Sequence, residues 1–574
     1  MSRKQYTAEE AYALLQSDSE FETASDMDYI EGSDNASVTS ESSTGGVSGD
    51  VDAADKEVAG PSSVVAPIIE ARTLPWEPAP SFTPRVNAFT VTPGITVDDS
   101  SFAEMDFFLL FLSDTLLDHI VHQTNLYATQ YIRQNPLSVH AREWTPTNIH
   151  EIKKFWGLTI NMGIVKKPKI RSYWSKNPIQ VTPVYSAVMS RSRYEHIMRF
   201  LHFSDNSQAP PSSDPNRDRL YKLRPLINML NQSFIEKYLP EQNVVVDESL
   251  LSFHGRLSFR QYLPSKRARY GIKLYKLCES ESGYTTAFRI YEGRDRTITA
   301  PGCSPDLSTS SNIVWEIMQP LLHKGYHLYC DNFYTSVALF RHLHAANTGA
   351  CGTMRKNRKG FSQQLVGKAL KKGESCAYAC DELLAVKYRD RKDVYLLSTI
   401  HSAECVSVRE RGAPADRQKP VSVAEYNKYM GGGVDLSDQV LQPYLVKRKT
   451  KTWYKKVAIY LIQIGIHNAF VLYKKKGGRD TYLDFQEKII EGLIFEPQDT
   501  RQSLECEKVK RLTERHFISP IPATETRNYP QKRCRVCSKN GQRRDSRYFC
   551  ASCPSQPGLC IHPCYKKYHT VLNY

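Results

Sequence analysis

The sequence has no cysteine before Cys278, although it contains 14 cysteines in 574 residues. A secreted protein held together by disulfides would spread its cysteines through the fold, so the placement argues against that class. No uninterrupted apolar run reaches the roughly 18–20 residues that span a bilayer. Residues 1–17 also lack the basic-plus-apolar pattern of a signal peptide. We therefore expect an intracellular protein with no membrane partner.

Basic residues are scarce at the N-terminus. The first 60 residues hold 14 acidic and three basic residues, a net charge of −11, so the other 514 residues carry +26. A basic body with an acidic tail suggests a polyanionic partner, such as nucleic acid, that the tail shields. Residues 1–95 are also rich in Ser, Gly, Ala and Pro. This composition predicts a disordered acidic N-terminal tail.

The spacing of apolar residues changes near residue 241. Residues 96–240 have apolar residues three and four apart, which predicts helices, and one of these helices fits a capping box at Ser192–Glu195. Beyond them, short apolar runs and alternating segments predict strands at Val244–Val246, Gly271–Leu277, Thr286–Tyr291 and Tyr326–Cys330, with helices at Ile313–Leu322 and Val337–Leu343. Three strands, a helix, a strand and a helix are in the order of an RNase H-like fold, where the first and fourth strands lie parallel and adjacent.

Three aspartates follow such runs or a tight turn. Asp247 ends the first strand, Asp331 ends the fourth, and Asp435 follows Gly431–Gly433. Carboxylates at buried strand ends repel each other, and divalent cations relieve that repulsion. The pattern predicts two Mg²⁺ ions for phosphoryl transfer, with Asp247 bridging them and Asp331 and Asp435 each completing one ion. Asp438 is the alternative third ligand, unless it serves to cap a helix.

Potential zinc ligands gather at the C-terminus. Two Cys-x2-Cys pairs at this separation indicate zinc, and eight ligands suit two tetrahedral ions in an interleaved cross-brace. Disulfides are the less favoured alternative for these cysteines. The predicted ligands are Cys534, Cys537, Cys550, Cys553, Cys560, His562, Cys564 and His569.

Basic segments flank two of the aspartates and continue into the cysteine-rich end. We expect their cations to contact DNA phosphates. Trp453 either stacks on an unpaired base or anchors its helix in the core. The predicted DNA-binding residues are Lys266, Arg267, Arg269, Lys447, Arg448, Lys449, Lys451, Trp453, Lys455, Lys456, Arg543 and Arg544.

Several of these segments together resemble the piggyBac family of DNA transposases. The resemblance covers roughly residues 85–574 and rests on the sequence around Asp247, the run at 266–273, the stretches at 331–336 and 429–435, and the tail at 564–569. One departure is the third glycine in Gly431–Gly433, where the family usually shows one or two. His562 also lacks an obvious counterpart in the family.

The resemblance implies an α/β multidomain protein with an RNase H-like catalytic core that an insertion domain interrupts. It also implies a helical dimerisation and DNA-binding domain from two segments, and a cysteine-rich zinc domain that binds the terminal inverted repeats. The implied boundaries are 1–95 for the tail, 96–240 and 447–525 for the helical segments, 241–354 and 428–446 for the core, 355–427 for the insertion, and 530–574 for the zinc domain.

The implied activity is cut-and-paste transposition by a nuclear homodimer. Water nicks the 3′ end of the element, and the freed 3′-OH attacks the opposite strand to form a hairpin. After the hairpin reopens, the 3′-OH joins a TTAA target. By position, the implied catalytic triad is Asp247, Asp331 and Asp435. A domesticated DNA-binding protein that no longer cuts is the alternative.

Overall fold

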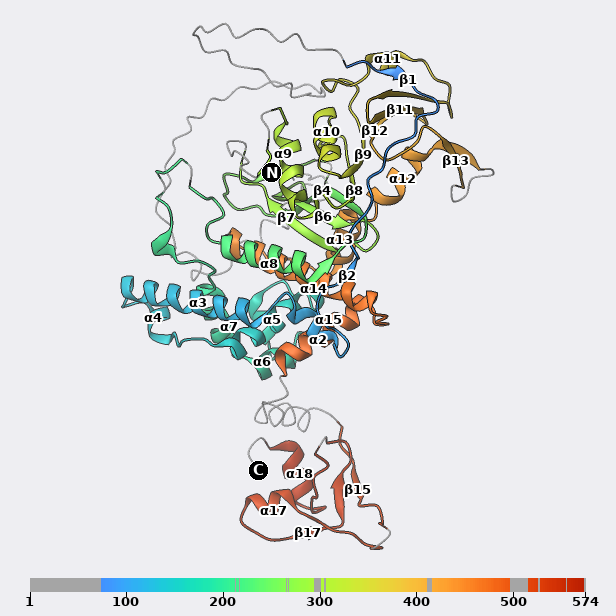
Figure 1. The fold of residues 1–574 in the computed structure, drawn as a ribbon. Helices are drawn as coiled ribbons and strands as arrows, with labels where there is room; N and C mark the ends of the chain where they lie inside the picture. Colours follow the sequence, from blue (N-terminus) through green and yellow to red (C-terminus); the bar gives the residue numbers. More distant parts are fainter. Residues whose placement is uncertain are drawn as a thin grey trace, which may run out of the picture. The chain divides into compact units, whose positions relative to one another are not determined.

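The protein is described by a computed structural model, which is shown in Figure 1. The described residues are 74–211, 213–215, 217–264, 266, 268–293, 301–303, 306–409, 416–495, 515–524, 527–553 and 555–571. The acidic segment at residues 1–60 and Arg267 lie outside these ranges.

A mixed β-sheet forms the core of the protein. Five of its strands follow the order β7-β6-β4-β8-β9, in which β4, β8 and β9 are parallel, β6 is antiparallel to β4, and β7 is antiparallel to β6, which confirms the RNase H-like topology. Helices α9 and α10 pack on one face, and α12 and α13 pack on the other. The elements are β4 (Asn243–Ser252), β6 (Tyr270–Glu279), β7 (Thr285–Ile290), β8 (His327–Cys330), β9 (Gly349–Thr353), α9 (Thr309–Met318), α10 (Val337–Ala345), α12 (Val421–Met430) and α13 (Val434–Leu441).

The predicted insertion at 355–427 continues this sheet beyond β9. Strand β12 pairs antiparallel with β9, and β11, β10 and β1 follow in order. Residues of β11 and β12 share one buried apolar cluster with residues of β4 and β8. The elements are α11 (Gln363–Gly367), β10 (Ser375–Cys380), β11 (Leu383–Arg389), β12 (Asp393–Ser398), and the hairpin of β13 (Cys405–Val408) and β14 (Arg417–Pro420).

Residues 74–95 are ordered against the core, which corrects the predicted extent of the tail. Strand β1 (Glu77–Pro78) joins the sheet edge, and β2 (Gly94–Ile95) pairs with β3 (Tyr238–Leu239). Buried Trp76 donates a hydrogen bond from Nε1 to the Gly360 carbonyl at 2.9 Å. Two large aromatic anchors, Trp76 and Phe89, thus hold this polar segment in place.

The helices come from two distant segments that share one buried core, as predicted. Figure 1 shows α14 and α15, coloured orange, lying among the blue and green helices. The first segment holds α2 (Glu104–Leu109), α3 (Asp114–Gln134), α4 (Val139–Glu143), α5 (Ile149–Ile164), α6 (Pro183–Val188), α7 (Arg191–Phe200) and α8 (Arg224–Lys237), and the second holds α14 (Trp453–Lys475) and α15 (Tyr482–Ile494).

Helix α14 is the one described helix that is long and apolar enough to cross a membrane, by length and composition alone. However, 78% of its apolar window is buried inside the protein. Its apolar side chains pack against helices of the first segment, which is typical of a core helix.

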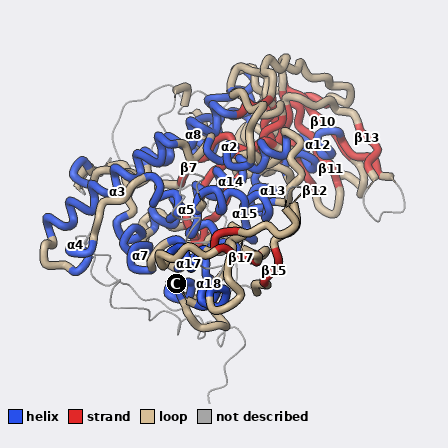
Figure 2. The backbone as a smooth tube through the Cα atoms, turned by 90° about the horizontal axis from the view of Figure 1, so that it is seen from below, coloured by secondary structure: helices blue, strands red, loops and turns tan. Residues whose placement is uncertain are grey.

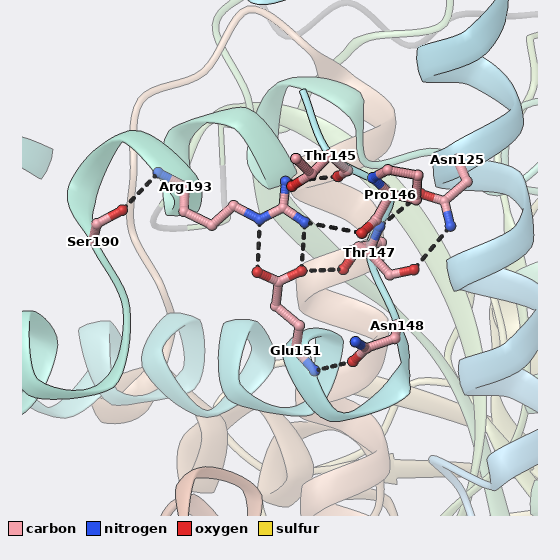
Figure 3. Close-up of polar contacts among 8 residues, drawn as sticks. All are labelled: Asn125, Thr145, Pro146, Thr147, Asn148, Glu151, Ser190 and Arg193. Atoms are coloured by element: carbon pink, nitrogen blue, oxygen red, sulfur yellow. Dashed lines mark hydrogen bonds and ion pairs between the residues drawn. The ribbon is translucent and has the colours of Figure 1, made fainter. Parts of the chain in front are cut away.

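A polar network joins three helices of the first segment (Figure 3). The Arg193 guanidinium binds both carboxylate oxygens of Glu151, with Nε–Oε1 at 2.6 Å, and donates to the Thr145 carbonyl at 2.8 Å. The side chain of Asn125, on α3, pairs with the backbone of Thr147. The predicted capping box at Ser192 is wrong: Ser190 caps α7 by accepting the Arg193 amide, which leaves the Arg193 side chain free to reach Glu151.

The C-terminal module is small and built around its cysteines. Strand β15 pairs with β18, and β16 pairs with β17, as two-stranded ribbons. Its elements, which Figure 2 shows together with those of the core, are β15 (Ile518–Pro520), β16 (Lys532–Arg533), α17 (Arg535–Lys539), β17 (Asp545–Ser546), β18 (Tyr548–Cys550) and α18 (Cys564–Thr570).

Candidate functional site

Asp247 and Asp331 lie at the ends of two neighbouring parallel strands. In the register of β4 and β8, Val246 pairs with Cys330, and each aspartate is the next residue of its chain. Side chains alternate between the faces of a sheet, so both aspartates share the face of Val245, which α12 and α13 cover. The structure therefore brings these two predicted residues together.

Neither of these carboxylates forms a salt bridge within the described ranges. Burial, followed by the charge of Glu248 and then that of Asp331, raises the pKa of Asp247 to about 7. Burial also raises the pKa of Asp331, although its carboxylate accepts the Phe333 amide at 2.9 Å. Two adjacent carboxylates with raised pKa values and no bound countercharge form a site that favours a divalent cation. The residues present thus fit magnesium, whose preferred ligands are oxygens.

Asp438 is committed to an ion pair with a buried lysine. Its carboxylate accepts hydrogen bonds from Ser249 Oγ at 2.6 Å and from the fully buried Lys276 Nζ at 2.8 Å. Burial lowers the pKa of Lys276, but the charges of Asp438, Tyr460 and Cys278 and the hydrogen bond to Asp438 together outweigh burial and raise it. Because Lys276 is the cross-strand partner of Asp247, this ion pair fixes α13 beside β4.

Asp435 is placed differently on the same helix. Its side chain is exposed and makes no hydrogen bond or ion pair with any residue that the structure describes. Gly433 packs against Val245, and Asp438 contacts Ser249, so Asp435 lies in the stretch of chain between these two contacts with β4. The ligand atoms of the three aspartates do not all come within 4.8 Å of one another, and among the described residues only cysteine and histidine groups meet that limit.

The glycines before Asp435 explain how α13 approaches the sheet. A Cβ on Gly433 would lie 2.7 Å from the Val245 Cβ, and one on Gly432 would lie 2.2 Å from the Ser280 carbonyl oxygen. Gly431, by contrast, has open space, with its nearest neighbour at 4.0 Å. Close contacts thus require Gly432 and Gly433 but not Gly431.

The predicted DNA-binding cations near the core are only partly exposed. Lys266 Nζ donates to the Glu248 carbonyl at 3.0 Å, while Arg269 is exposed. In the second segment Lys447, Lys449 and Lys451 are exposed, and Arg448 and Lys456 are half-buried. Burial lowers the pKa of Lys456. Arg543 and Arg544 are exposed on the C-terminal module.

Lys455 is not a DNA contact. Its side chain is buried, and Nζ donates to the carbonyls of Met198 at 2.7 Å and Arg199 at 2.6 Å. A cation there binds carbonyl groups at the C-terminal end of α7, where the helix dipole favours positive charge. Trp453 is half-buried and packs edge-on against Phe259, with ring centroids 5.4 Å apart. Of its two predicted roles, the structure supports the core anchor.

Lys455 and Lys451 should therefore respond differently to substitution. Lys455→Met leaves two helix-end carbonyls without their donor, so we expect it to lower the free energy of unfolding by about 1–3 kcal/mol. Lys451→Met should leave thermal stability unchanged, weaken DNA binding and reduce its salt dependence. Thermal denaturation and fluorescence anisotropy at two salt concentrations measure both effects. A stable Lys455→Met protein with weakened DNA binding would contradict this assignment.

Two arginines missed from the sequence hold the loop after Asp331. Arg355 Nε donates to the Asn332 side chain at 3.1 Å, and Arg358 donates to the carbonyls of Asn332 and Phe333 at 3.0 and 2.7 Å. Burial, followed by the charge of Arg355, lowers the pKa of Arg358, and the charge of Asp331 opposes this, so the Arg358 guanidinium lies close enough to Asp331 to interact with it. The basic run at 355–359 was the available signal.

The C-terminal module contains two metal-binding groups, each with four ligand atoms within 4.8 Å of one another. One group is Cys534, Cys537, Cys560 and Cys564, and the other is His516, Cys550, Cys553 and His569. The two groups interleave along the chain, as predicted. His562 is exposed and belongs to neither group, so its predicted role is wrong. His516 takes that place, and the module begins before residue 530.

The distances fit zinc. Cys537 Sγ lies 3.5 Å from Cys564 Sγ and 4.0 Å from Cys560 Sγ, too far for a disulfide and close to the edge of a tetrahedron with zinc–sulfur bonds of about 2.3 Å. His569 Nδ1 lies 2.9 Å from the Tyr565 carbonyl, which accepts its hydrogen and leaves Nε2 for the metal. None of the described cysteines forms a disulfide.

Replacing His516 should remove one of two zinc ions. His516→Ala takes away one of four ligands, so we expect native mass spectrometry to find about one zinc per chain, with loss of structure in the module. His562→Ala is the matched control and should retain two. Loss of zinc from the His562 variant, with none from the His516 variant, would contradict the ligand assignment.

Family models match most of the chain. The model described as Transposase IS4 matches residues 103–470. The model described as DDE_Tnp_1-like zinc finger matches residues 516–570, a range that includes His516 and His569. The two matches cover both the core with its helices and the C-terminal module.

Individual proteins show the same similarity. Human PiggyBac transposable element-derived protein 3 is 27% identical over 480 residues, which cover 80% of this chain and 75% of that protein. Human PiggyBac transposable element-derived protein 2 is 30% identical over 382 residues, or 64% of this chain and 61% of that protein. The cryo-EM structure of a piggyBac transposase synaptic complex with hairpin DNA shares the fold, with a TM-score of 0.60 at 24% identity over 82% of this chain and 98% of that chain.

Proposed function

Because the chain belongs to the Transposase IS4 family, as a piggyBac-like member, we propose that it cuts and joins DNA strands at a magnesium site of Asp247, Asp331 and Asp435. The observation that carries this proposal is the pair of unneutralised carboxylates at the ends of β4 and β8. Asp435 is the third ligand in this proposal, since Asp438 is already paired with Lys276.

The chemistry is displacement at phosphorus with a hydroxyl as nucleophile. Bound magnesium ions would activate the attacking oxygen and stabilise the leaving oxygen. Asp247 would bridge the ions, while Asp331 and Asp435 would each hold one. Lys266, whose charge acts on Asp247, lies where it can neutralise a phosphate beside the reacting one. One site can serve hydrolysis, hairpin formation and joining, because only the nucleophile changes.

The remaining parts have roles in holding DNA. The zinc module, with exposed Arg543 and Arg544, would bind the terminal inverted repeats, and the exposed lysines of 447–451 would contact their backbone. Joining at TTAA, assembly as a homodimer and a nuclear location complete the proposal. These follow from the family resemblance and are consistent with the basic charge of the chain.

A second candidate is a DNA-binding protein that has lost cleavage. The names of the two human relatives, which describe proteins derived from transposable elements, favour it. Retention of all three aspartates favours the first candidate.

An excision assay distinguishes the two candidate functions. The reporter carries an insert flanked by the inverted repeats that border the gene.

We expect the wild-type protein to excise the insert and to restore the reporter. Asp331→Asn should abolish excision, because one ion loses its ligand, whereas Asp390→Asn, in the turn between β11 and β12, should excise normally. The readout is sequencing of the repaired junction. DNA binding by the wild-type protein without any excision would support the second candidate.

A further inference from the structure

Two tyrosines stand exposed at the edge of the catalytic sheet. Tyr262 of β5 (Gln261–Tyr262) pairs directly with Tyr270 at the start of β6. Their side chains keep 53% and 42% of their surface exposed, and their ring centroids lie 4.6 Å apart. Neither hydroxyl has a hydrogen-bond partner among the described residues. Large aromatic side chains are normally buried, so the exposed ring surface of these two tyrosines is available to a ligand.

The surroundings of the pair are uniformly basic. Residues 253–270 contain five arginines and lysines and no acidic residue. The Arg260 guanidinium lies 5.5 Å from the centre of the Tyr270 ring, and its Nη1 donates to the His254 and Gly255 carbonyls, which holds it in place. Aromatic rings beside fixed cations match a nucleic-acid strand, with the rings for bases and the cations for phosphates.

The position of the pair relates it to the proposed site of cleavage. Tyr270 is next to Gly271, which pairs with Ser252, five residues beyond Asp247 on β4. At about 3.3 Å per residue this is about 17 Å, or about five nucleotide steps of 3.4 Å. The intervening loop turns back, so that Lys266 reaches the Glu248 carbonyl. Basic side chains thus continue from the tyrosines to the carboxylates.

We propose that Tyr262 and Tyr270 form a stacking platform for unpaired bases of the DNA strand that lies about five nucleotides from the phosphate at Asp247. This proposal rests on the proposed function, since it assumes that DNA reaches that site. A stacked base would cover the exposed ring faces, and Arg260, Lys266 and Arg269 would contact the adjoining phosphates. The platform would favour DNA that is locally open over a fully paired duplex.

Binding of two labelled DNAs by the full-length protein tests the platform. One is a fully paired 30-mer, and the other is the same 30-mer with five mismatched pairs at its centre. Fluorescence anisotropy should show tighter binding of the mismatched DNA. For the mismatched DNA, the affinity of the Tyr262→Leu/Tyr270→Leu variant should fall about tenfold for each base that no longer stacks on a ring. For the paired DNA, its affinity should fall by less than about twofold. The Tyr262→Phe/Tyr270→Phe variant keeps both rings and should bind as the wild type does.

Results that would overturn the platform alone can be distinguished from those that would also overturn the proposed function. Equal binding of mismatched DNA by the leucine and wild-type proteins, with thermal stability unchanged, would overturn the platform and leave the proposed function intact. Failure of the wild-type protein to bind either DNA would overturn the proposed function, and the platform with it. A lower molecular mass in light scattering for the leucine variant alone would show that the tyrosines contact another chain, which would also overturn the platform.

Discussion

Asp247→Asn is expected to abolish strand cleavage while raising the thermal stability of the metal-free protein. Cleavage should fall by at least about 10³-fold, since the substitution removes the ligand that would bridge both ions. Stability should rise because burial and the neighbouring charges oppose ionisation of Asp247, and asparagine has no charge to bury. Cleavage of end-repeat DNA and thermal denaturation in EDTA measure the two effects.

The same raised pKa determines how stability depends on pH. In the unfolded chain Asp247 loses its proton near its ordinary pKa of 3.8, whereas in the folded, metal-free protein its pKa is about 7. Between these values the folded state binds more protons, so stability falls as the pH rises from about 4 to about 7. Magnesium binds the ionised form, so its stabilising effect should grow over the same range and then level off.

The control is Asp390→Asn, which removes a charge from the turn between β11 and β12. It should change neither cleavage nor the pH profile of stability. If the Asp247→Asn protein were less stable than the wild type in EDTA at pH 7, the folded protein would be stabilising the ionised carboxylate without any metal. That result would contradict a site that needs an added cation.

Asp438→Ala is expected to destabilise the fold by about 3–5 kcal/mol, because it leaves the buried Lys276 charge unpaired. Asp435→Ala, on the same helix, should leave stability unchanged and abolish cleavage. The two substituted positions lie three residues apart on α13, and each variant lacks one carboxylate, so each is a control for the other. Chemical denaturation and the cleavage assay give both readouts.

A double variant separates the ion pair from other effects. Lys276→Met/Asp438→Leu removes both charges, and we expect it to recover most of the stability lost in Asp438→Ala. Full stability in Asp438→Ala together with lost cleavage would show that Asp438, and not Asp435, is the third ligand.

The sequence predicted the core because its signals were local. Continuous apolar runs marked β4 and β8, and the general order of strands and helices then placed Asp247 beside Asp331. Strand β9 was missed because its sequence, Gly-Ala-Cys-Gly-Thr, lacks the branched and aromatic residues typical of strands. Close packing requires a glycine in this strand, since a Cβ on Gly352 would lie 2.2 Å from Thr335 Oγ1.

Contacts between residues far apart in the sequence could not be predicted from any local pattern. His516 lies 34 residues before Cys550, the ligand that it contacts, and has no neighbouring ligand in sequence, whereas His562 sits between two cysteines. Lys455 likewise follows a run of basic residues, and only the packing of α14 against α7 shows that its charge is turned inward. The Asp438–Lys276 pair joins segments 162 residues apart.

Iron-directed backbone cleavage tests the central claim most directly. With Fe²⁺ in place of Mg²⁺, ascorbate and peroxide produce hydroxyl radicals that cut the chain next to the bound ion, whatever DNA the protein recognises. We expect cuts beside Asp247, Asp331 and Asp435 that excess Mg²⁺ suppresses and that disappear in Asp247→Asn. Absence of cuts at these three positions, or cuts that persist in Asp247→Asn, would contradict a shared metal site.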